Sequence, residues 1–514
     1  MQAISTSAAA PAPPTRPSEP SLATIRDEDF GYAQARHLLF RAGFGGTDRQ
    51  IRELAAMGPR RAVEHLVEYH DIPCEPDAAD AFDRDIISPL SDRERRALYR
   101  ARRRGDEDTL ARFRVRRQRA QQADRRQIVE IQRWWITRMI RTPRPLEEKM
   151  TLFWHGHFAT SYRVVEDSYH MYQQNRMLRE HATGHLGDLI LGILRDPAML
   201  RSLNNNRNRK RSPNENLARE LLELFSLGEG RYTERDIKET ARVLTGFTYE
   251  DDDFRFNRDA HDNGVKRVLG ARGNLSAVDL VNAILRRRAC AEFIATKLYR
   301  FFVRDIPMDP RETDAVTRRA VLGIADMLRR ANYRIGPVLG ELFLSRHFYD
   351  PANTGTMIKS PADLLVGAVR SLGVPVRDLG TAADAMKLMG QQLFVPPSVK
   401  GWDGGRSWIN TSTLFIRQNL LVYMLTGRLP ARRGDPLSPH GYDARRLVPA
   451  LVDPGSGAPT DERIAAELAE LTLGSSDPGL TRAAVDAAGG RLTDNDHLVR
   501  SLVFLTSLPA YQLT

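Results

Sequence analysis

Cysteines are few in this 514-residue chain, and long apolar runs and a secretion signal are missing. Two cysteines, Cys74 and Cys290, cannot build a disulfide scaffold and fit a reducing compartment. No run of about 18 apolar residues occurs, so we expect no transmembrane helix. The N-terminus lacks a basic stretch followed by an apolar one. We therefore expect a cytoplasmic protein, or a periplasmic or exported one if the true start lies upstream.

Several common catalytic motifs are also missing. The chain has no P-loop, no G-x-S-x-G elbow, no H-E-x-x-H and no C-x-x-C. The glycine fingerprint of dinucleotide-binding folds does not occur between a predicted strand and helix. These absences point the search toward histidines, carboxylates and tryptophans.

Positive charge is concentrated in one segment. The chain has 76 basic and 65 acidic residues, a net charge of +11, and residues 91–126 alone contain 14 arginines and 6 acids. This segment has few aromatic residues and no recognisable base-reading module. We expect a solvated, arginine-rich helical hairpin. The alternative is contact with a polyanion or a membrane surface through Arg102, Arg103 and Arg104.

Apolar residues recur with helical spacing over most of the chain. We expect a mostly α fold, a multi-helical globular body with little β structure. Residues 390–410 are too rich in Pro and Gly for a helix and predict an ordered loop over that body, and residues 248–268 predict a short hairpin or loop. The expected organisation is a disordered arm at 1–27, a helical domain at 28–425, a linker or loop at 426–460, and C-terminal helices packed on the body at 461–514.

A single helix with clear start and stop residues is predicted at 213–227. Ser212 suits the N-cap, Pro213 the first helical position and Gly228 the stop. Its apolar residues cover about half the circumference, and the other side carries polar groups. Those polar residues are Glu215, Asn216, Arg219, Glu220 and Glu223. Covered by water they make an ordinary amphipathic helix, and covered by protein they make a carboxylate cluster that needs a cation, a proton or a substrate.

The hexapeptide at 153–158, F-W-H-G-H-F, contains two histidines that could share a metal ion. In an extended segment His155 and His157 would point the same way, and even in a turn they would lie close together. Candidates for a third ligand are His181, His261, Glu220 and Glu223. Such nitrogen and oxygen ligands suit zinc, iron or manganese. Buried imidazoles stacked on aromatic rings are the alternative.

Two tryptophans lie in the predicted loop, Trp402 and Trp408. They could stack against a sugar or another flat ligand. The simpler interpretation is that they anchor the loop to the core.

The chain resembles the bacterial proteins grouped as domain of unknown function 1800. The resemblance rests on H-L-L-F-R-A-G-F-G at 37–45, F-W-H-G-H-F at 153–158, P-N-E-N-L-A-R-E-L at 213–221 and L-T-G-F at 244–247. His261-Asp262, I-K-S-P at 358–361, Pro396-Pro397 and Gly401-Trp402 follow in the family's order. It spans about residues 30–425, and the final Ala510-Tyr511-Gln512 is a further candidate match. The family has no assigned activity, but its members are often exported, and its motifs include both the histidines and the polar helix, which implies a common polar site.

Our leading hypothesis is a metal-dependent enzyme, a hydrolase by default, because a bound divalent ion lowers the pKa of its water to about 7. In this hypothesis His155 and His157 bind the metal with His261 or Glu220, Glu215 or Glu223 acts as general base, and Arg219 orients the substrate. The substrate would contact Asn214, Asn216, Trp402 and Trp408.

Two other functions fit the sequence. One is metal-free acid–base chemistry on a glycan or other polymer, with two carboxylates at work and the tryptophans lining a sugar subsite. The other is a non-catalytic helical scaffold with a basic docking surface.

Overall fold

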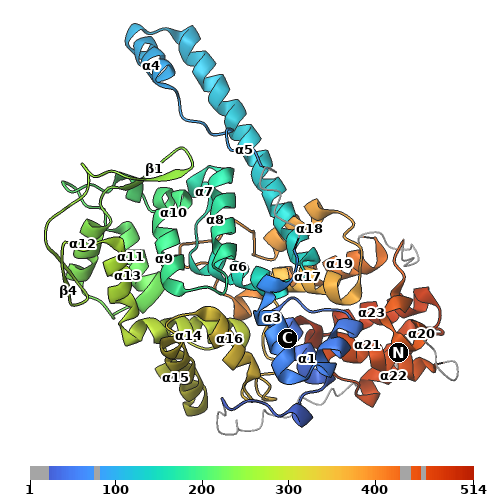
Figure 1. The fold of residues 1–514 in the computed structure, drawn as a ribbon. Helices are drawn as coiled ribbons and strands as arrows, with labels where there is room; N and C mark the ends of the chain where they lie inside the picture. Colours follow the sequence, from blue (N-terminus) through green and yellow to red (C-terminus); the bar gives the residue numbers. More distant parts are fainter. Residues whose placement is uncertain (1–21, 75–81, 429–440, 453–458) are drawn as a thin grey trace.

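Helices make up most of the chain, as predicted. The structure is a computed structural model that describes residues 22–74, 82–428, 441–452 and 459–514 (Figure 1). Within these ranges the only sheets are two antiparallel two-stranded hairpins. No helix in the described ranges combines the length and the apolar character needed to cross a membrane.

The N-terminal helices pack against the C-terminal ones, far apart in sequence (Figure 1). The N-terminal elements are η1 (Asp27–Asp29), α1 (Tyr32–Ala42), α2 (Asp48–Ala56), α3 (Gly58–Val67) and η2 (Tyr69–Asp71). The C-terminal elements are η7 (Ala444–Leu447), α20 (Pro449–Val452), α21 (Asp461–Leu473), α22 (Pro478–Ala488), α23 (Asn495–Ser507) and η8 (Pro509–Gln512). Arg36 of α1 joins the two groups, donating to the carbonyl oxygens of Leu471 (3.0 Å) and Thr472 (2.8 Å).

Two predicted boundaries need correction. The N-terminal segment expected to be disordered, residues 1–27, lies largely outside the described residues. Its last part is ordered, since the Ile25 amide donates to the Leu344 carbonyl (2.8 Å) and the Ile25 side chain is buried. The linker expected at 426–460 falls partly outside the described residues as well. Within its described residues, 441–452 contain η7 and α20 and bury Tyr442 and Val448. Apolar residues in both stretches occupy core positions, which their overall composition, rich in Ala, Pro and Ser in the first and in Pro and Gly in the second, does not reveal.

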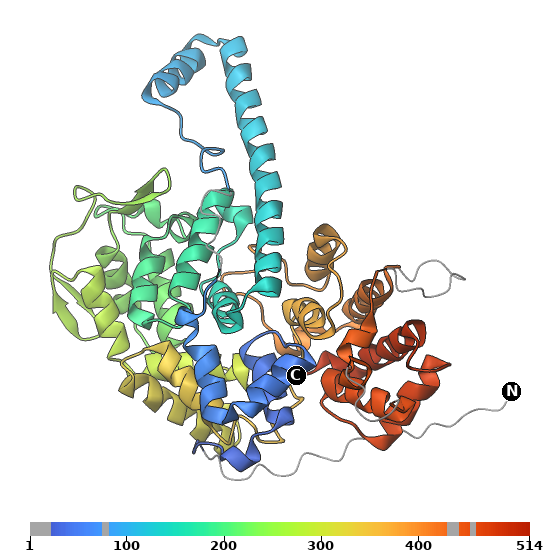
Figure 2. The same cartoon turned by 45° about the vertical axis from the view of Figure 1, so that its right-hand side comes forward.

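A helical hairpin, which we call the arm, projects from the body (Figures 1 and 2). It consists of α4 (Asp92–Arg104) and the first half of α5 (Glu107–Arg141). Ser91 caps α4, and Gly105, in the left-handed conformation, ends it. The second half of α5 enters the body and buries one face, which includes Ile128, Ile131 and Trp135. All 14 arginines of residues 91–126 are exposed, so the segment forms an arginine-rich helical hairpin whose arginines face outward.

The helices of the middle of the chain carry the sequence motifs. They are α6 (Pro145–His157), α7 (Tyr162–Val165), α8 (Ser168–Glu180), α9 (Leu186–Arg195), α10 (Pro197–Ser202), η3 (Asn205–Arg207), α11 (Asn216–Leu222), the π-helical turn η4 (Glu223–Leu227) and α12 (Glu234–Val243). Two hairpins follow, β1 (Phe247–Glu250) with β2 (Asp253–Phe256) and β3 (Lys266–Val268) with β4 (Ala271–Gly273). The predicted hairpin excursion at 248–268 is therefore confirmed.

The remaining helices surround the predicted loop. They are α13 (Ala277–Leu285), α14 (Arg288–Phe302), η5 (Pro310–Glu312), α15 (Ala315–Arg330), α16 (Ile335–Leu344), α17 (Pro361–Leu372), α18 (Leu379–Leu388) and α19 (Thr411–Thr426). Residues 390–410 are all described and contain no α-helix, only the short 3-10 turn η6 (Gly405–Trp408). Their Pro and Gly residues thus predicted the loop correctly.

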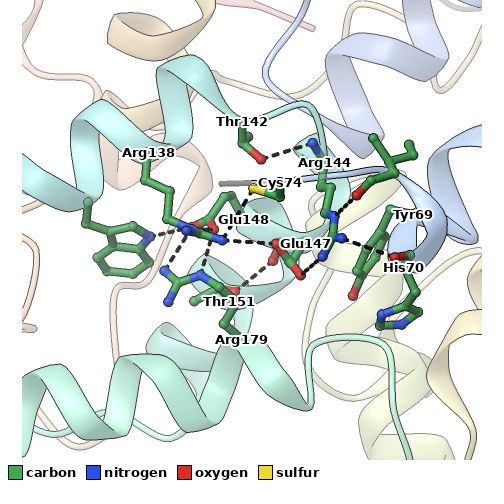
Figure 3. Close-up of polar contacts among 12 residues, drawn as sticks. Tyr69, His70, Cys74, Arg138, Thr142, Arg144, Glu147, Glu148, Thr151 and Arg179 are labelled. Atoms are coloured by element: carbon green, nitrogen blue, oxygen red, sulfur yellow. Dashed lines mark hydrogen bonds and ion pairs between the residues drawn. The ribbon is translucent and has the colours of Figure 1, made fainter. Parts of the chain in front are cut away.

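A buried charge network fastens the base of the arm to the body (Figure 3). Glu148 of α6 is fully buried and accepts hydrogen bonds from Arg179 of α8 (2.6 Å) and from Trp135 of α5 (2.8 Å). Arg138 of α5 also pairs with Glu148 and lies 3.3 Å from Glu147. Burial opposes ionisation of Glu148, but the two arginines outweigh it and lower the pKa of this carboxyl. The network orients α5, α6 and α8 relative to one another.

Buried apolar residues form one continuous cluster that runs from Ile25 to Tyr511. Polar contacts reinforce it near the end of the chain. Lys359 donates to the Tyr511 carbonyl (2.7 Å), and Arg417 donates to Gln512 (3.1 Å). The C-terminal helices therefore share their core with the rest of the chain.

Candidate functional site

The polar helix begins three residues later than predicted. Ser212 does not cap it, and Pro213 lies outside, because the amide of Asn214 donates to the Asn208 side chain (2.9 Å). Asn214 then accepts from the Asn216 amide (2.9 Å), and the helix starts at Asn216. Its end at Gly228, with φ of +85°, is as predicted, but the last turn is the π-helical η4. Asn214 and Asn216 thus shape a turn.

Glu215, Arg219 and Glu223, the expected catalytic residues, lie on a salt-bridged surface. Arg219, 39% exposed, binds Glu234 through two hydrogen bonds (3.0 and 3.1 Å) and lies 3.6 Å from Glu215. Glu223 accepts from the Tyr232 hydroxyl (2.6 Å). These contacts describe the amphipathic helix that we gave as the alternative.

The two histidines of F-W-H-G-H-F lie on helix α6, which is neither of the two backbone geometries considered for a shared metal, the extended segment and the turn. Residues two apart on a helix point about 200° apart, to opposite sides. His155 accepts from the Phe394 amide (3.1 Å) between the rings of Trp135 and Trp402. His157 donates through Nε2 to the Phe225 carbonyl (3.1 Å). Burial lowers the pKa of each to about 3, so both are neutral.

The other expected metal ligands occupy separate surroundings. His261 donates to the Thr245 carbonyl (2.8 Å) and packs against Phe256. Glu220 is half-buried, and burial followed by the charge of Glu223 raises its pKa, while Lys400 opposes the change. Among the described residues no group of three or more His, Cys, Asp or Glu side chains is placed to hold an ion. The structure therefore does not bring together the four ligands that the sequence suggested.

The F-W-H-G-H-F motif instead seats the loop that carries the tryptophans. A Cβ on Gly401, which has φ of +82°, would collide with the carbonyl oxygen of Gly156. A Cβ on Gly156 would lie 3.7 Å from the Trp402 ring. Glycine at both positions lets the loop backbone lie directly on α6, and the Phe394–His155 hydrogen bond fixes the loop's other end.

A cavity of about 170 Å³ lies between this loop and helices α6, α14 and α17. Trp402 and Trp408 both line it, as does His157. Its apolar wall comes from Leu152, Phe153 and Phe301. Of the predicted site residues, the structure thus gathers His157 and the two tryptophans.

Charged groups line the same cavity, and most of them are paired. Arg300 binds Asp305 (3.0 Å), and Asp363 binds Lys149. Lys297 of α14 differs, because it has neither an ion pair nor a hydrogen bond within the described part of the chain. Burial, followed by the positive charge of Arg300, lowers the pKa of the Lys297 amine to about 8.

Two further polar atoms, which belong to side chains that line the cavity, are buried and have no partner among the described residues. They are Nδ1 of His157, whose side chain is 4% exposed, and Nε1 of Trp402. Because Nε2 of His157 donates to Phe225, its Nδ1 is an acceptor, whereas the indole N–H is a donor. A buried donor and a buried acceptor without partners suit a polar ligand.

A family model matches residues 37–513, nearly the whole chain. The chain belongs to the DUF1800 family. The family is described as "Protein of unknown function (DUF1800)". No curated protein and no solved structure matches the chain.

The match extends through α23, so the DUF1800 domain includes the C-terminal helices and does not end at about 425. The cavity of this DUF1800 protein is where two of its sequence motifs meet, the histidine motif on α6 and the Gly401-Trp402 pair.

Sequence reasoning missed Lys297. It stands in A-T-K-L-Y-R-F-F, near the end of a helix whose neighbouring residues are mostly apolar. The indication that the sequence offered was a single lysine within a mostly apolar stretch of helix. Helical periodicity alone does not tell whether it faces solvent or a cavity.

Proposed function

We propose that this protein is an enzyme that binds a small anionic organic molecule beside Trp402 and transfers a proton through Lys297. One observation carries the proposal. The Lys297 amine lines an aromatic-walled cavity without a counter-ion in the described chain, since the neighbouring Asp305 and Asp363 are paired with Arg300 and Lys149. Lys297 is half-buried, and a charged amine without an ion partner at this depth is stabilised by water or by an anionic ligand in the cavity.

The Lys297 amine suits acid–base work near neutral pH. With a pKa of about 8, roughly a tenth of it is neutral at pH 7 and can accept a proton. Its protonated form can return that proton or hold an anion. An amine whose pKa lies close to the working pH is the usual choice for a general base.

Other groups at the cavity supply binding. Trp402 and Trp408 offer flat faces to a sugar-like or planar molecule. The free Trp402 N–H and His157 Nδ1 orient polar groups of the ligand, and Lys400 at the rim attracts its negative charge. The proposal keeps the tryptophan subsite of the acid–base hypothesis and replaces its two carboxylates by a lysine.

Tryptophan fluorescence tests the proposal. Sugar acids, sugar phosphates and short keto acids are titrated into the wild type, into Lys297→Met and Trp402→Leu, and into Lys238→Met, a change of an exposed lysine on α12. We expect at least one anion to bind the wild type and Lys238→Met equally, and the other two variants at least tenfold more weakly. Failure of every anion to bind, or equal binding to all four proteins, would contradict the proposal.

Metal-dependent hydrolysis stays a separate prediction. Elemental analysis of the purified protein beside a His155→Ala/His157→Ala variant measures it. Near-stoichiometric zinc, iron or manganese that is lost in a folded variant would support it, and a metal-free native protein after reconstitution would contradict it.

We also infer that the arm contacts a polyanion. Arg93, Arg96, Arg100 and Arg104 recur at helical spacing along one face of α4, and all four are exposed. None of them forms an ion pair within the described chain. Arg102 lies on another face, beside residues 85–90, so of the predicted contact residues Arg103 and Arg104 lie on the side of this row and Arg102 does not.

A second row lies on α5, where Arg112, Arg119 and Arg126 are spaced by seven residues and are exposed. Helices α4 and α5 are antiparallel, and the Glu94–Arg116 ion pair marks where they touch. On each helix the arginine row lies about a quarter turn from this contact, so both rows face the same side of the hairpin. Binding of labelled heparin or duplex DNA should weaken steeply with salt. Alanine at Arg96, Arg100 and Arg119 should weaken it more than alanine at Arg102, Arg114 and Arg117, and the reverse order would contradict the assignment.

A further inference from the structure

We propose that the substrate carries an aldehyde or ketone group and that Lys297 binds it covalently as an imine. The inference rests on the proposed function, because it names the substrate class and the bond formed at the same site.

The choice of lysine at position 297 is the first argument. The chain contains 68 arginines and only 8 lysines, so arginine supplies nearly all of its positive charge. Arg300, one turn further along α14, shows that arginine is accommodated at the same cavity. A guanidinium keeps its proton at any physiological pH, and only an amine presents a nucleophilic nitrogen. A site that only bound an anion would not need a lysine in place of an arginine.

The surroundings of the amine are the second argument. Its Nζ lies 5.6 Å from the centre of the Phe293 ring, and Phe153 and Phe301 line the cavity. Arg300 adds a neighbouring positive charge, while the carboxylates of Asp305 and Asp363 are engaged elsewhere. An apolar wall together with a nearby cation is the environment that activates imine-forming lysines.

The unpartnered atoms at the cavity are the third argument. Condensation passes through a carbinolamine, whose hydroxyl group needs an acceptor and whose neighbouring oxygen atoms need donors. His157 Nδ1 is a buried acceptor fixed in one tautomer by the Phe225 carbonyl, and Trp402 Nε1 is a buried donor. Both line the cavity that holds Lys297.

The bond changes balance without a further reagent. The neutral Lys297 amine attacks the carbonyl carbon, a C–N bond forms, and the carbonyl oxygen takes one proton from the nitrogen to give the carbinolamine. The C–O bond then breaks, the nitrogen loses its second proton, and water leaves as the C=N bond forms. Hydrolysis of the imine reverses these steps. The imine withdraws electrons from the adjacent carbon, so a proton or a carboxyl group bound there can leave.

Borohydride reduction traps such an imine. The wild type is incubated with pyruvate, glyoxylate or glyceraldehyde 3-phosphate, reduced with sodium borohydride, digested and analysed by mass spectrometry. We expect Lys297 to carry the reduced adduct of at least one probe at more than ten times the level of exposed lysines such as Lys210 and Lys238. Lys297→Met should lose that adduct, and Lys238→Met should keep it.

The outcomes separate this inference from the proposed function. An anion that binds in a Trp402-dependent way but leaves no adduct on Lys297 overturns the imine and leaves acid–base catalysis standing. Labelling spread evenly over the lysines also overturns it. Absence of both binding and adduct overturns both proposals. Circular dichroism melts of Lys297→Met confirm that the variant is folded, and wild-type trapping decides the question if it is not.

Discussion

The carboxylates of Glu148 and Glu215 show how differently one residue type behaves in this molecule. Glu148 is fully buried and binds two arginines and an indole N–H, whereas Glu215 is partly exposed and lies 3.6 Å from an arginine that has another partner. Removing one partner of a buried ion pair leaves an uncompensated charge, while surface pairs contribute little.

We predict that Glu148→Gln lowers the free energy of unfolding by about 3–5 kcal/mol, because Arg138 and Arg179 lose the buried carboxylate that both of them bind. Glu215→Gln, the matched surface change, should stay within about 0.5 kcal/mol of the wild type. Urea denaturation measures both. Equal effects of the two changes would show that the network is not stabilising.

His170 provides a residue-scale pH dependence. Burial opposes its charged form, but the hydrogen bond to Asp252 (3.3 Å) and the charge of Asp167 (3.5 Å) outweigh burial and raise its pKa above 6.5. The stabilisation is therefore complete below pH 6.5, the ordinary value, and is lost as the pH rises through the raised one. Thermal midpoints of the wild type and His170→Gln should differ most in acid and converge in alkali. A difference that grows with pH would contradict the assignment.

At this scale the sequence predicted residue types better than roles. Trp402 and Trp408 line the cavity, as the predicted ligand subsite requires. The bulky aromatic side chains of a glycine-rich loop pack against the elements beside the loop. Lys297 and Glu148 went unnoticed, since the depth of a charged side chain depends on neighbours distant in sequence. Arg219 was placed correctly on the polar side of its helix, but only the structure shows that Glu234 neutralises it.

Among the elements, the loop at 390–410 depends most directly on single glycines. Gly401 and Gly404 both have positive φ angles, +82° and +77°. They differ in space, because a Cβ on Gly401 would collide with Gly156 of α6, whereas a Cβ on Gly404 would meet nothing within 4 Å. Alanine substitutions at the two glycines therefore separate the cost of backbone strain from the cost of a collision between two elements.

We predict that Gly401→Ala destabilises the protein by about 1–3 kcal/mol more than Gly404→Ala. Both changes carry the cost of a strained backbone with positive φ, about 1–3 kcal/mol, but only the first forces the loop off α6. Thermal melts measure the difference, and Trp402 emission should shift to longer wavelength in Gly401→Ala alone. Equal melting temperatures for the two variants would show that the close contact is unimportant.

The helices also show which boundaries local sequence rules predict and which they do not. The helix stop at Gly228 was predictable because glycine readily takes a positive φ angle. The start was not, since Asn208, in a preceding loop, holds the Asn214 amide and keeps Pro213 out of the helix. The backbone conformation of the histidine pair could not be predicted for a related reason. Its six residues allow either an extended or a helical backbone, and packing against the loop through His155 accompanies the helix.

For the molecule as a whole, the shared core ties the C-terminal helices to the body. Lys359 and Arg36 donate to carbonyl groups of residues 471–511, and apolar residues from both ends of the chain lie in one cluster. The compositional boundaries near 425 and 460 do not mark the end of this cluster, because Tyr442 and Val448 between them belong to it, so the extent of the domain could not be predicted from them. The mostly α fold and the arm could be predicted, because helical periodicity and charge are local.

We predict that a chain ending at Arg428 does not fold cooperatively, because it exposes the apolar surface covered by α21 and α23 and leaves Lys359 without the Tyr511 carbonyl. Near-UV circular dichroism during a thermal melt measures this. A sharp transition in the truncated chain, close to that of the full chain, would show that the body is an independent domain.

The cavity between the tryptophan loop and α14 brings the three scales together, since a residue, a loop and three helices build one site. The most direct measurement of its central claim is the pH dependence of amine acylation, with limiting acetic anhydride and mass spectrometry resolving each lysine. The account predicts that the acylation rate of Lys297 reaches half its maximum near pH 8, about two units below the ordinary value of a lysine amine. Half-maximal acylation of Lys297 only at about pH 10, the ordinary value, would contradict it.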